Sequence, residues 1–329
     1  MRSKATAAAA IAVTALTVGA AVAVQEVVSP PGDSRASGIA TPVPDGLSRD
    51  PGASVPEQRP STEPAPPTSS VATSSEPESG RTPDDADRDR PDSSGSGFPD
   101  ASTTGVPDGV ELTPAGSVTI TVDGAVFEGK DFGCVTVAAH DVVIRESRVT
   151  CARTEPSVYN KGRNLLVEDV EIDGTGDGEV AIGFSNYTAR RVDIHGSEDG
   201  VKAESDTRLE DSYIHHLARQ PGSHGDAVQT SKGSGIRIIG NTLQAYNTST
   251  GDLMNAAWMV SETFGPVSDA VFAHNLVNGG NYTINGEGSV VVRGNTFGRR
   301  SRYGPISLSP DVSFERSNVW ADNGRPVAN

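Results

Sequence analysis

The amino-acid sequence predicts an all-β protein, a parallel β-helix of about nine coils preceded by a disordered linker. Three observations predict it. One eight-residue phrase recurs along the chain, asparagines recur at one place in that phrase, and two cysteines occupy matching places in consecutive copies. Internal repeats of about 20–50 residues are typical of solenoids, in which each repeat packs only on its neighbours.

The N-terminal segment, residues 1–23, has the features of a signal peptide. Arg2 and Lys4 precede an Ala- and Val-rich stretch that ends in the cleavage pattern Ala21-Val22-Ala23. The same stretch is long enough to span a bilayer, so an uncleaved signal anchor is the alternative. Both interpretations predict a secreted or cell-surface protein, tethered to the membrane in the second case.

Residues 24–97 are rich in Pro, Ser, Thr, Asp and Glu and contain no aromatic residue. A segment with so little to bury cannot offset its ordering entropy, and we expect a disordered linker. All 16 aromatic residues follow it (8 Phe, 6 Tyr and 2 Trp), so residues 98–329 are expected to form one folded domain.

The repeat itself indicates strands. Its copies alternate apolar and polar residues, are rich in Val, Ile and Thr, and are separated by Gly, Asn and Asp, which favours short strands joined by turns. Each copy ends in an apolar anchor that we expect to point into the core. The anchors are Phe132, Val149, Ile172, Ile194, Ile214, Leu243, Val277, Phe297 and Val319.

Two further patterns fit this alignment. Two residues before their anchors, Asn241, Asn275 and Asn295 are expected to stack in a turn, because Asn tolerates left-handed backbone and stacked amides bond to one another. Ser212 and Ser317 are expected to flank them. Cys134 and Cys151 each follow their anchors by two residues, so stacked coils predict a disulfide in an exported chain.

With its opening FPDASTTGVPDGVELT and the phrases SEDGVK and SHGDAVQ, the chain from Phe98 onward resembles the secreted bacterial right-handed parallel β-helix proteins of the pectate lyase-like superfamily. The resemblance implies a right-handed helix that engages a cell-wall or environmental polysaccharide. It does not select the chemistry, since this fold hosts lyases, hydrolases, epimerases and non-catalytic adhesins.

The charge of the domain excludes some partners. Residues 98–329 contain 19 basic and 30 acidic residues, whereas nucleic acids and anionic membrane surfaces require a basic footprint. We therefore expect no nucleic acid, no membrane contact by the folded domain, and a monomer.

The spacing of the anchors locates a candidate site. The two longest intervals are neighbours, and their extra residues fall in 215–227 and 244–257. Insertions in a solenoid form loops, often on the binding face, so these two are expected to wall a groove beside Gln229. The substrate-binding candidates there are Gln229, His216, Arg219, Tyr246 and Trp258.

Two functional hypotheses use the aligned phrases EDGVK and GDAVQ. In a lyase, Lys202 is the base of a β-elimination, and Ca²⁺ bound by Asp199, Asp226 and Glu204 neutralises the substrate carboxylate. The resemblance favours this chemistry. In a hydrolase, Asp199 and Asp226 form an acid–base pair assisted by His224. The alternative to both is a non-catalytic, adhesin-like surface binder in which these residues only form turns.

Overall fold

The computed structural model describes residues 97–220 and 222–328. The expected signal segment 1–23 and nearly all of the expected linker lie outside these residues. Within them every regular element is a β-strand, which confirms the all-β class. The described part of the chain contains no helix long and apolar enough to cross a membrane.

The described residues form 22 strands joined in one sheet that winds around the molecule. In chain order they are β1 (Thr113–Ile120), β2 (Val126–Glu128), β3 (Lys130–Val137), β4 (Val143–Thr150), β5 (Val158–Asn160), β6 (Leu165–Gly183), β7 (Tyr187–Arg190), β8 (Asp193–Lys202), β9 (Thr207–Glu210), β10 (Tyr213–Ile214), β11 (Asp226–Thr230), β12 (Gly233–Ile239), β13 (Thr242–Ala245), β14 (Ala256–Val260), β15 (Val267–Ala273), β16 (Leu276–Gly279), β17 (Tyr282–Gly286), β18 (Val290–Arg293), β19 (Thr296–Phe297), β20 (Gly304–Leu308), β21 (Ser313–Phe314) and β22 (Val319–Trp320).

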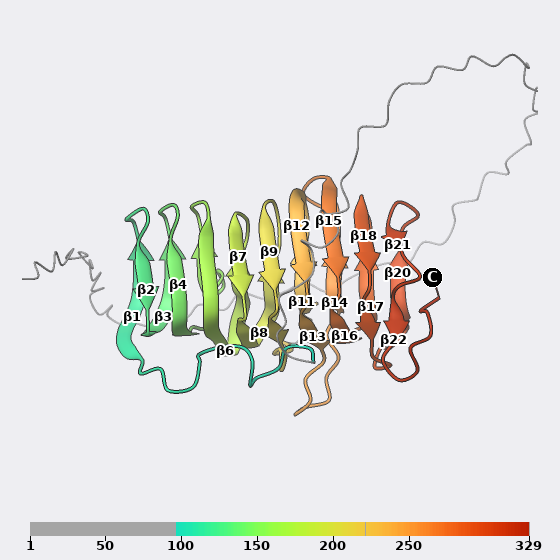
Figure 1. Cartoon of the computed structure of the whole chain (residues 1–329), viewed down its shortest axis with the longest axis horizontal. Coiled ribbons are helices and arrows are strands. Elements are labelled where there is room, and N and C mark those ends of the chain that lie inside the picture. Colours follow the sequence, from blue (N-terminus) through green and yellow to red (C-terminus); the bar gives the residue numbers. More distant parts are fainter. Residues whose placement is uncertain (1–96, 221, 329) are drawn as a thin grey trace, which may run out of the picture. The chain divides into compact units, whose positions relative to one another are not determined.

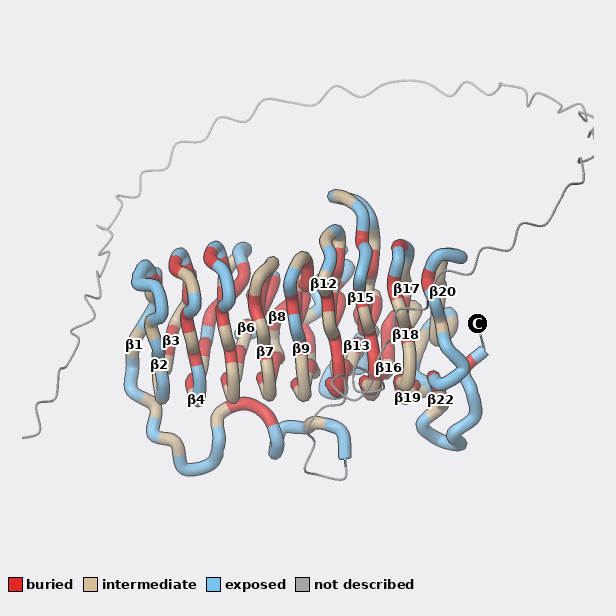
Figure 2. Tube along the Cα trace, turned by 45° about the horizontal axis from the view of Figure 1, so that its top comes forward, coloured by how far each residue is buried: buried red, intermediate tan, exposed pale blue. Residues whose placement is uncertain are grey.

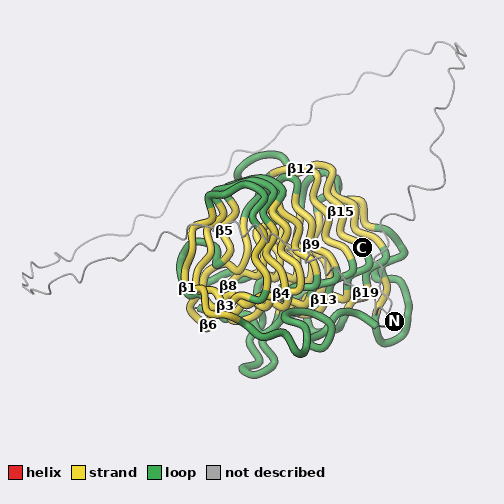
Figure 3. The backbone as a smooth tube through the Cα atoms, turned by 60° about the vertical axis from the view of Figure 1, so that its left-hand side comes forward, coloured by secondary structure: helices red, strands yellow, loops and turns green. Residues whose placement is uncertain are grey.

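These strands pair in parallel with strands of the preceding and following coils, as in a β-solenoid (Figures 1 and 3). Three faces result. Face 1 comprises β2, β4, the start of β6, β7, β9, β12, β15, β18 and β21. Face 2 includes the middle of β6, the start of β8, β10, β13, β16, β19 and β22. Face 3 includes β5, the ends of β6 and β8, β11, β14, β17 and β20.

The predicted anchors form one column on face 2. The eight anchors from Phe132 to Phe297 form seven consecutive in-register pairs, and all eight are buried, which confirms this part of the alignment. Figure 2 shows the buried stretches recurring from coil to coil. The ninth anchor was wrong by one residue, because Trp320 and not Val319 pairs with Phe297.

A ladder of asparagines explains that shift. The side-chain oxygens of Asn275, Asn295 and Asn318 each accept bonds from the backbone N–H and the side-chain amide of the preceding asparagine, at 2.9–3.0 Å. Asn318 therefore continues the ladder where Ser317 was expected, and Ser317 is exposed. We call Asn241, Asn275, Asn295 and Asn318, all fully buried, the asparagine ladder.

The stacking prediction is thus confirmed, but its conformational reason was wrong. The left-handed residue of each turn precedes the asparagine, as at Gly240 (φ 75°), His274 (φ 58°) and Gly294 (φ 64°). The asparagines are required for their hydrogen bonds, since a buried backbone N–H without a partner is costly.

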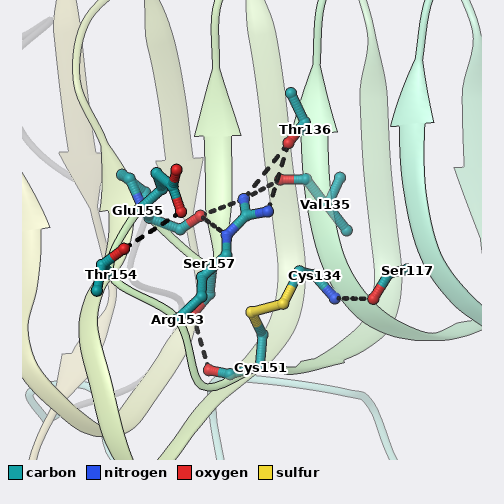
Figure 4. The surroundings of a disulfide bond; sticks show 10 residues. Ser117, Cys134, Val135, Thr136, Cys151, Arg153, Thr154, Glu155 and Ser157 are labelled. Atoms are coloured by element: carbon teal, nitrogen blue, oxygen red, sulfur yellow. Dashed lines mark hydrogen bonds between the residues drawn. A yellow bond between two sulfur atoms is a disulfide. The ribbon is translucent and has the colours of Figure 1, made fainter. Parts of the chain in front are cut away.

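The predicted disulfide is also confirmed. Cys134 and Cys151 lie on neighbouring coils with their Cα atoms 5.0 Å apart (Figure 4). Beside them the Arg153 guanidinium donates to the carbonyl oxygens of Pro156 and Val135, which ties the same two coils together. No cysteine is left free.

Alternating charges run along face 1. In register, Glu128 lies beside Arg145, Arg145 beside Glu168, Glu168 beside Arg190, and Arg190 beside Glu210. We call these five residues the charge column. Arg145 bonds Glu128 at 2.5 Å, and Glu168 accepts from both Arg190 and Arg191. Opposite charges in register stabilise a parallel stack, and a one-residue slip would disrupt the pairs.

Candidate functional site

The two predicted insertions lie where the chain passes from face 2 to face 3. The first separates β10 from β11, and the second separates β13 from β14 (Figure 1). Tyr246 and Leu253 form an antiparallel bridge that closes the second insertion into a hairpin-like loop. Arg219 in the first insertion donates to the Leu253 carbonyl at 3.2 Å, so the two loops contact each other.

The aligned phrases stack as predicted. Lys202 at the end of β8 pairs in register with Gln229 in β11, and Val201 pairs with Val228. The backbone N–H of Asp226 donates to Asp199 Oδ1 at 2.7 Å, which brings the two aspartates together. Because the paired valines are buried, Lys202 and Gln229 point outward from face 3.

These side chains form a closed set of contacts that we call the Lys202 network. Lys202 Nζ donates to Asp199 Oδ2 at 2.5 Å and also to Gln229 Oε1. Gln229 Nε2 donates to Asp226 Oδ2 at 3.2 Å. Asn255, which the sequence did not single out, donates to Asp226 Oδ1 at 3.0 Å. Lys202 is 17% exposed, so it alone among the charged members reaches the surface appreciably.

Asp226 is the most perturbed group of the Lys202 network. Burial, followed by the nearby charge of Asp199, raises the pKa of Asp226 well above its usual value. Its side chain is fully buried and both carboxyl oxygens accept amide N–H bonds. Asp226 therefore has no route to a glycan, and its contacts position Gln229 and, through Gln229, Lys202.

The residues expected to bind calcium do not share one centre. Glu204 contacts Ser185 at 3.4 Å and Lys232 at 3.6 Å, whereas Asp199 contacts the Lys202 ammonium. In the described ranges, no three or more His, Cys, Asp or Glu side chains are grouped so that they could hold a metal ion. Calcium binding by this chain stays a prediction, and no step below depends on it.

A second pair of carboxyl groups lies beside this network. Gly178 pairs with Ser197 and Val180 with Asp199, so Glu179 of β6 lies level with Glu198 of β8. Burial, then Asp199 and Glu179, raise the pKa of the Glu198 carboxyl. Glu198 is partly exposed and Glu179 is exposed. The sequence carried a signal for Glu198, since it precedes Asp199 in SEDGVK, but only Asp199 was aligned.

The predicted residue His224 joins this pair through its backbone. Its N–H donates to the Glu198 carboxyl, and the residue is exposed at the end of the first insertion. The loop thereby places the backbone of His224 at the edge of the same carboxyl pair.

The other substrate-binding candidates have different environments. Trp258 is fully buried, stacks on Phe272 with ring centroids 4.7 Å apart and donates to Thr230. The prediction that Trp258 binds substrate was therefore wrong, because its place in β14 is level with the inward-pointing Val228. Tyr246 lies under the Arg300 guanidinium, 4.6 Å from its ring centroid. His216 belongs to a separate cluster on face 2, described below.

A cavity of about 290 Å³ lies away from these residues, on face 1. Thr188, Asp206, Arg208, Gly235 and Arg237 line it. Arg208 is paired with Glu210 and Arg237 with Asp269, so both cations of the cavity already have partners. No family model matches the chain, and comparison with curated proteins and with solved structures found no match either.

Proposed function

We propose that the protein is an exported, right-handed parallel β-helix enzyme that hydrolyses glycosidic bonds of a polysaccharide. The observation that carries this proposal is the neighbouring pair Glu198 and Glu179, one carboxyl with a raised pKa and one exposed carboxyl on the adjacent coil. Glycoside hydrolysis uses such a pair, in which one group is protonated and the other ionised.

The role of each group follows from its surroundings. Burial and two neighbouring acids raise the pKa of Glu198 and so favour its protonated form, which suits this carboxyl to the role of proton donor. It donates that proton to the glycosidic oxygen, and Glu179 supplies the carboxylate that activates water or attacks the sugar. The exposed His224 borders the pair, and the outward side chains Lys202 and Gln229 bind sugar hydroxyls on face 3.

The remaining parts of the proposal have their own support. Right-handed winding is supported by the parallel pairing, since crossovers between parallel strands are right-handed in nearly all proteins. The phrases SEDGVK and SHGDAVQ support a polysaccharide partner through the resemblance given above. The N-terminal pattern supports export, either as a secreted protein or as one tethered at the cell surface.

Two alternatives remain to be separated by experiment. Lys202 is a weak candidate for a lyase base, because its ammonium already donates to Asp199 Oδ2 and to Gln229 Oε1. A non-catalytic surface binder is favoured by the closed Lys202 network, whose members satisfy one another. That network explains the stacked polar residues without any reaction.

A panel of soluble glycans tests the proposal. We expect new reducing ends without an unsaturated product, and we expect Glu198→Gln to lower the rate by about 100-fold or more while glycan retention persists. Asp177→Asn, an exposed change in the same β6–β8 region, is the matched control and should retain the rate. Absorbance from an unsaturated product would instead establish a lyase, and retention without turnover would establish a binder.

A further inference from the structure

Four polar side chains form a continuous row from the second insertion to face 2. Thr248 Oγ1 contacts His216 Nε2, and His216 Nδ1 lies 2.5 Å from His215 Nδ1. His215 Nε2 lies 2.7 Å from Asp193 Oδ1. We call Thr248, His216, His215 and Asp193 the histidine relay. It joins residues from an exposed loop, a turn and the start of β8, which are up to 55 positions apart in the sequence.

When both imidazoles are neutral, the chemistry of the groups gives one consistent placement of the protons. An ionised Asp193 only accepts, so His215 Nε2 carries a proton and donates it. In neutral His215, Nδ1 then accepts, and His216 Nδ1 carries the proton between the two rings. His216 Nε2 is consequently bare and accepts from the Thr248 hydroxyl. One consistent assignment therefore directs the lone pair of a neutral imidazole at a hydroxyl proton.

Burial is graded along the histidine relay. The side chains of Asp193 and His215 are 12% and 14% exposed, whereas Thr248 is exposed to solvent. Tyr213 stacks on His215 with ring centroids 4.1 Å apart, which holds the ring in place. Gly105 lies against Asp193 so closely that an added Cβ would be 3.1 Å from Asp193 Cβ. Asp193 and His215, which orient His216, are thus enclosed, whereas Thr248 is accessible to solvent.

The groups facing His216 favour its neutral form. Burial lowers the pKa of His216, the charges of His215 and His195 lower it further, and Asp193 opposes them. On the neighbouring coil, His195 contacts Glu171 and Asp173 and has its pKa raised, chiefly by the bond to Glu171. His216 is therefore available as a base at neutral pH.

We propose that the histidine relay is a second catalytic site, at which Thr248 is the nucleophile of a carboxylic ester hydrolase. A hydroxyl bonded to a base that a third group orients is the general signature of an activated nucleophile. Thr248 and His216 are the catalytic residues, and His215 and Asp193 are positioning residues. The substrate class is an acyl ester on a glycan or other alcohol, and the site is independent of the proposed glycosidase.

The reaction balances with water as the only co-reactant. Thr248 Oγ forms a bond to the ester carbonyl carbon as its proton passes to His216 Nε2. The carbon–alkoxide bond then breaks, and that proton leaves with the alcohol. Water attacks the acyl-threonine, gives one proton to His216, and releases the acid as the Thr248 hydroxyl recovers a proton from His216.

The full chain and p-nitrophenyl acetate test this site. We expect hydrolysis that falls about 100-fold or more in Thr248→Val and His216→Gln. We expect it to survive in Thr248→Ser, which keeps the hydroxyl. Thr250→Val is the matched control, because Thr250 lies on the same loop and bonds Asp252 at 2.7 Å without contacting the relay.

Two further measurements separate catalysis from a structural role. An acyl-enzyme trapped at short times should map to Thr248 by peptide mass spectrometry. The pKa of His216 is lowered, so activity should be retained at neutral pH and fall as pH drops through that lowered pKa. Asp193→Asn should shift this fall in activity to still lower pH, since it removes a charge that stabilises protonated His216. Equal rates in wild type and Thr248→Val, or acylation at another residue, would overturn the proposal. The histidine relay would then have only a structural role, holding the second insertion in place. Neither result bears on Glu198.

Discussion

A carboxyl group at the start of β11 is completely shielded from solvent, and its ionisation therefore opposes folding. The pKa of Asp226 is raised well above 3.8, chiefly by burial, so the folded protein holds this proton more tightly than the unfolded chain. Its contribution to stability is fully present below about pH 3.8 and is lost as pH rises through the pKa in the folded state.

Asp226→Asn removes that titration. The amide stays neutral at every pH, although its nitrogen faces an N–H donor from Gln229 or Asn255, which costs a constant amount. We expect the melting temperature of the variant, relative to wild type, to increase from about pH 3 to pH 8. Thermal unfolding across this range checks it, with the exposed Asp108→Asn as control. A difference independent of pH would contradict the assignment.

The Lys202 network also shows which residues could be placed in the fold from the sequence and which could not. The stacking of Lys202 on Gln229 followed from two aligned phrases, because strand alternation fixes direction once the coils are in register. Asn255 and Trp258 could not be placed in this way. They lie within the longest interval between anchors, from Leu243 to Val277, where no sequence pattern defines where the next strand begins. Asn255 was therefore not singled out, and Trp258 was expected to be accessible to substrate.

Among the elements, the asparagine ladder connects successive coils at the turn between faces 1 and 2. Asn275 accepts two bonds from Asn241, donates to Asn295 and donates to the Ile238 carbonyl. Asn275→Leu removes the acceptor of the buried Asn241 backbone N–H and the side-chain donations to the Ile238 carbonyl and to Asn295. We expect a loss of about 1–3 kcal/mol in the free energy of unfolding.

Chemical denaturation of Asn275→Leu measures that loss. Asn323→Leu is the matched control, since Asn323 is exposed near the C-terminus and bonds only locally to Arg325. If both variants unfold at the denaturant concentration of wild type, the ladder does not contribute to stability as we infer.

The charge column makes a pH-dependent contribution on face 1. Burial raises the pKa of Glu168, but hydrogen bonds from Arg190 and Arg191 outweigh it, and the pKa is lowered below 4.5. The resulting stability is present above pH 4.5 and is lost as pH falls through the pKa in the folded state. Glu168→Gln also leaves two arginines side by side.

We therefore expect Glu168→Gln to destabilise the protein by about 1–2 kcal/mol at neutral pH. The difference should diminish in high salt and disappear at acidic pH. Denaturant melts at several pH values check this, and Glu128→Gln, at the exposed end of the same column, is the matched control and should have little effect. A loss that persists at acidic pH would point to packing instead of charge.

The register of the strands was predicted correctly from the sequence except in the last coil. Anchors up to Phe297 were placed correctly because each phrase repeats an alternation that ends in an apolar anchor, and three consecutive copies also carry Asn two places before it. In the last copy Ser317 stands two places before the predicted anchor Val319, but it is Asn318 that forms the ladder bond. Hydrogen-bonding capacity, and not resemblance of the phrase, decided the register. The charge column, which spans five coils, was visible only once that register was known.

Over the whole molecule, stability is expected to be local along the stack. Each strand pairs only with strands of adjacent coils, so the described chain approximates a one-dimensional array of nearest-neighbour contacts. The disulfide joins two coils near the N-terminal end and closes a 17-residue separation. A link of this length stabilises by about 3 kcal/mol in the chain-entropy view.

Replacing both cysteines, as Cys134→Ser with Cys151→Ser, should therefore destabilise one end of the stack and not all of it. Hydrogen exchange is expected to accelerate in β1–β4 while β17 and β18, which pair only with coils far from the disulfide, keep their protection in the same sample. These two strands are the internal reference. Uniform acceleration along the chain would mean that the coils unfold as one cooperative unit, and nearest-neighbour stacking would then be the wrong description of this molecule.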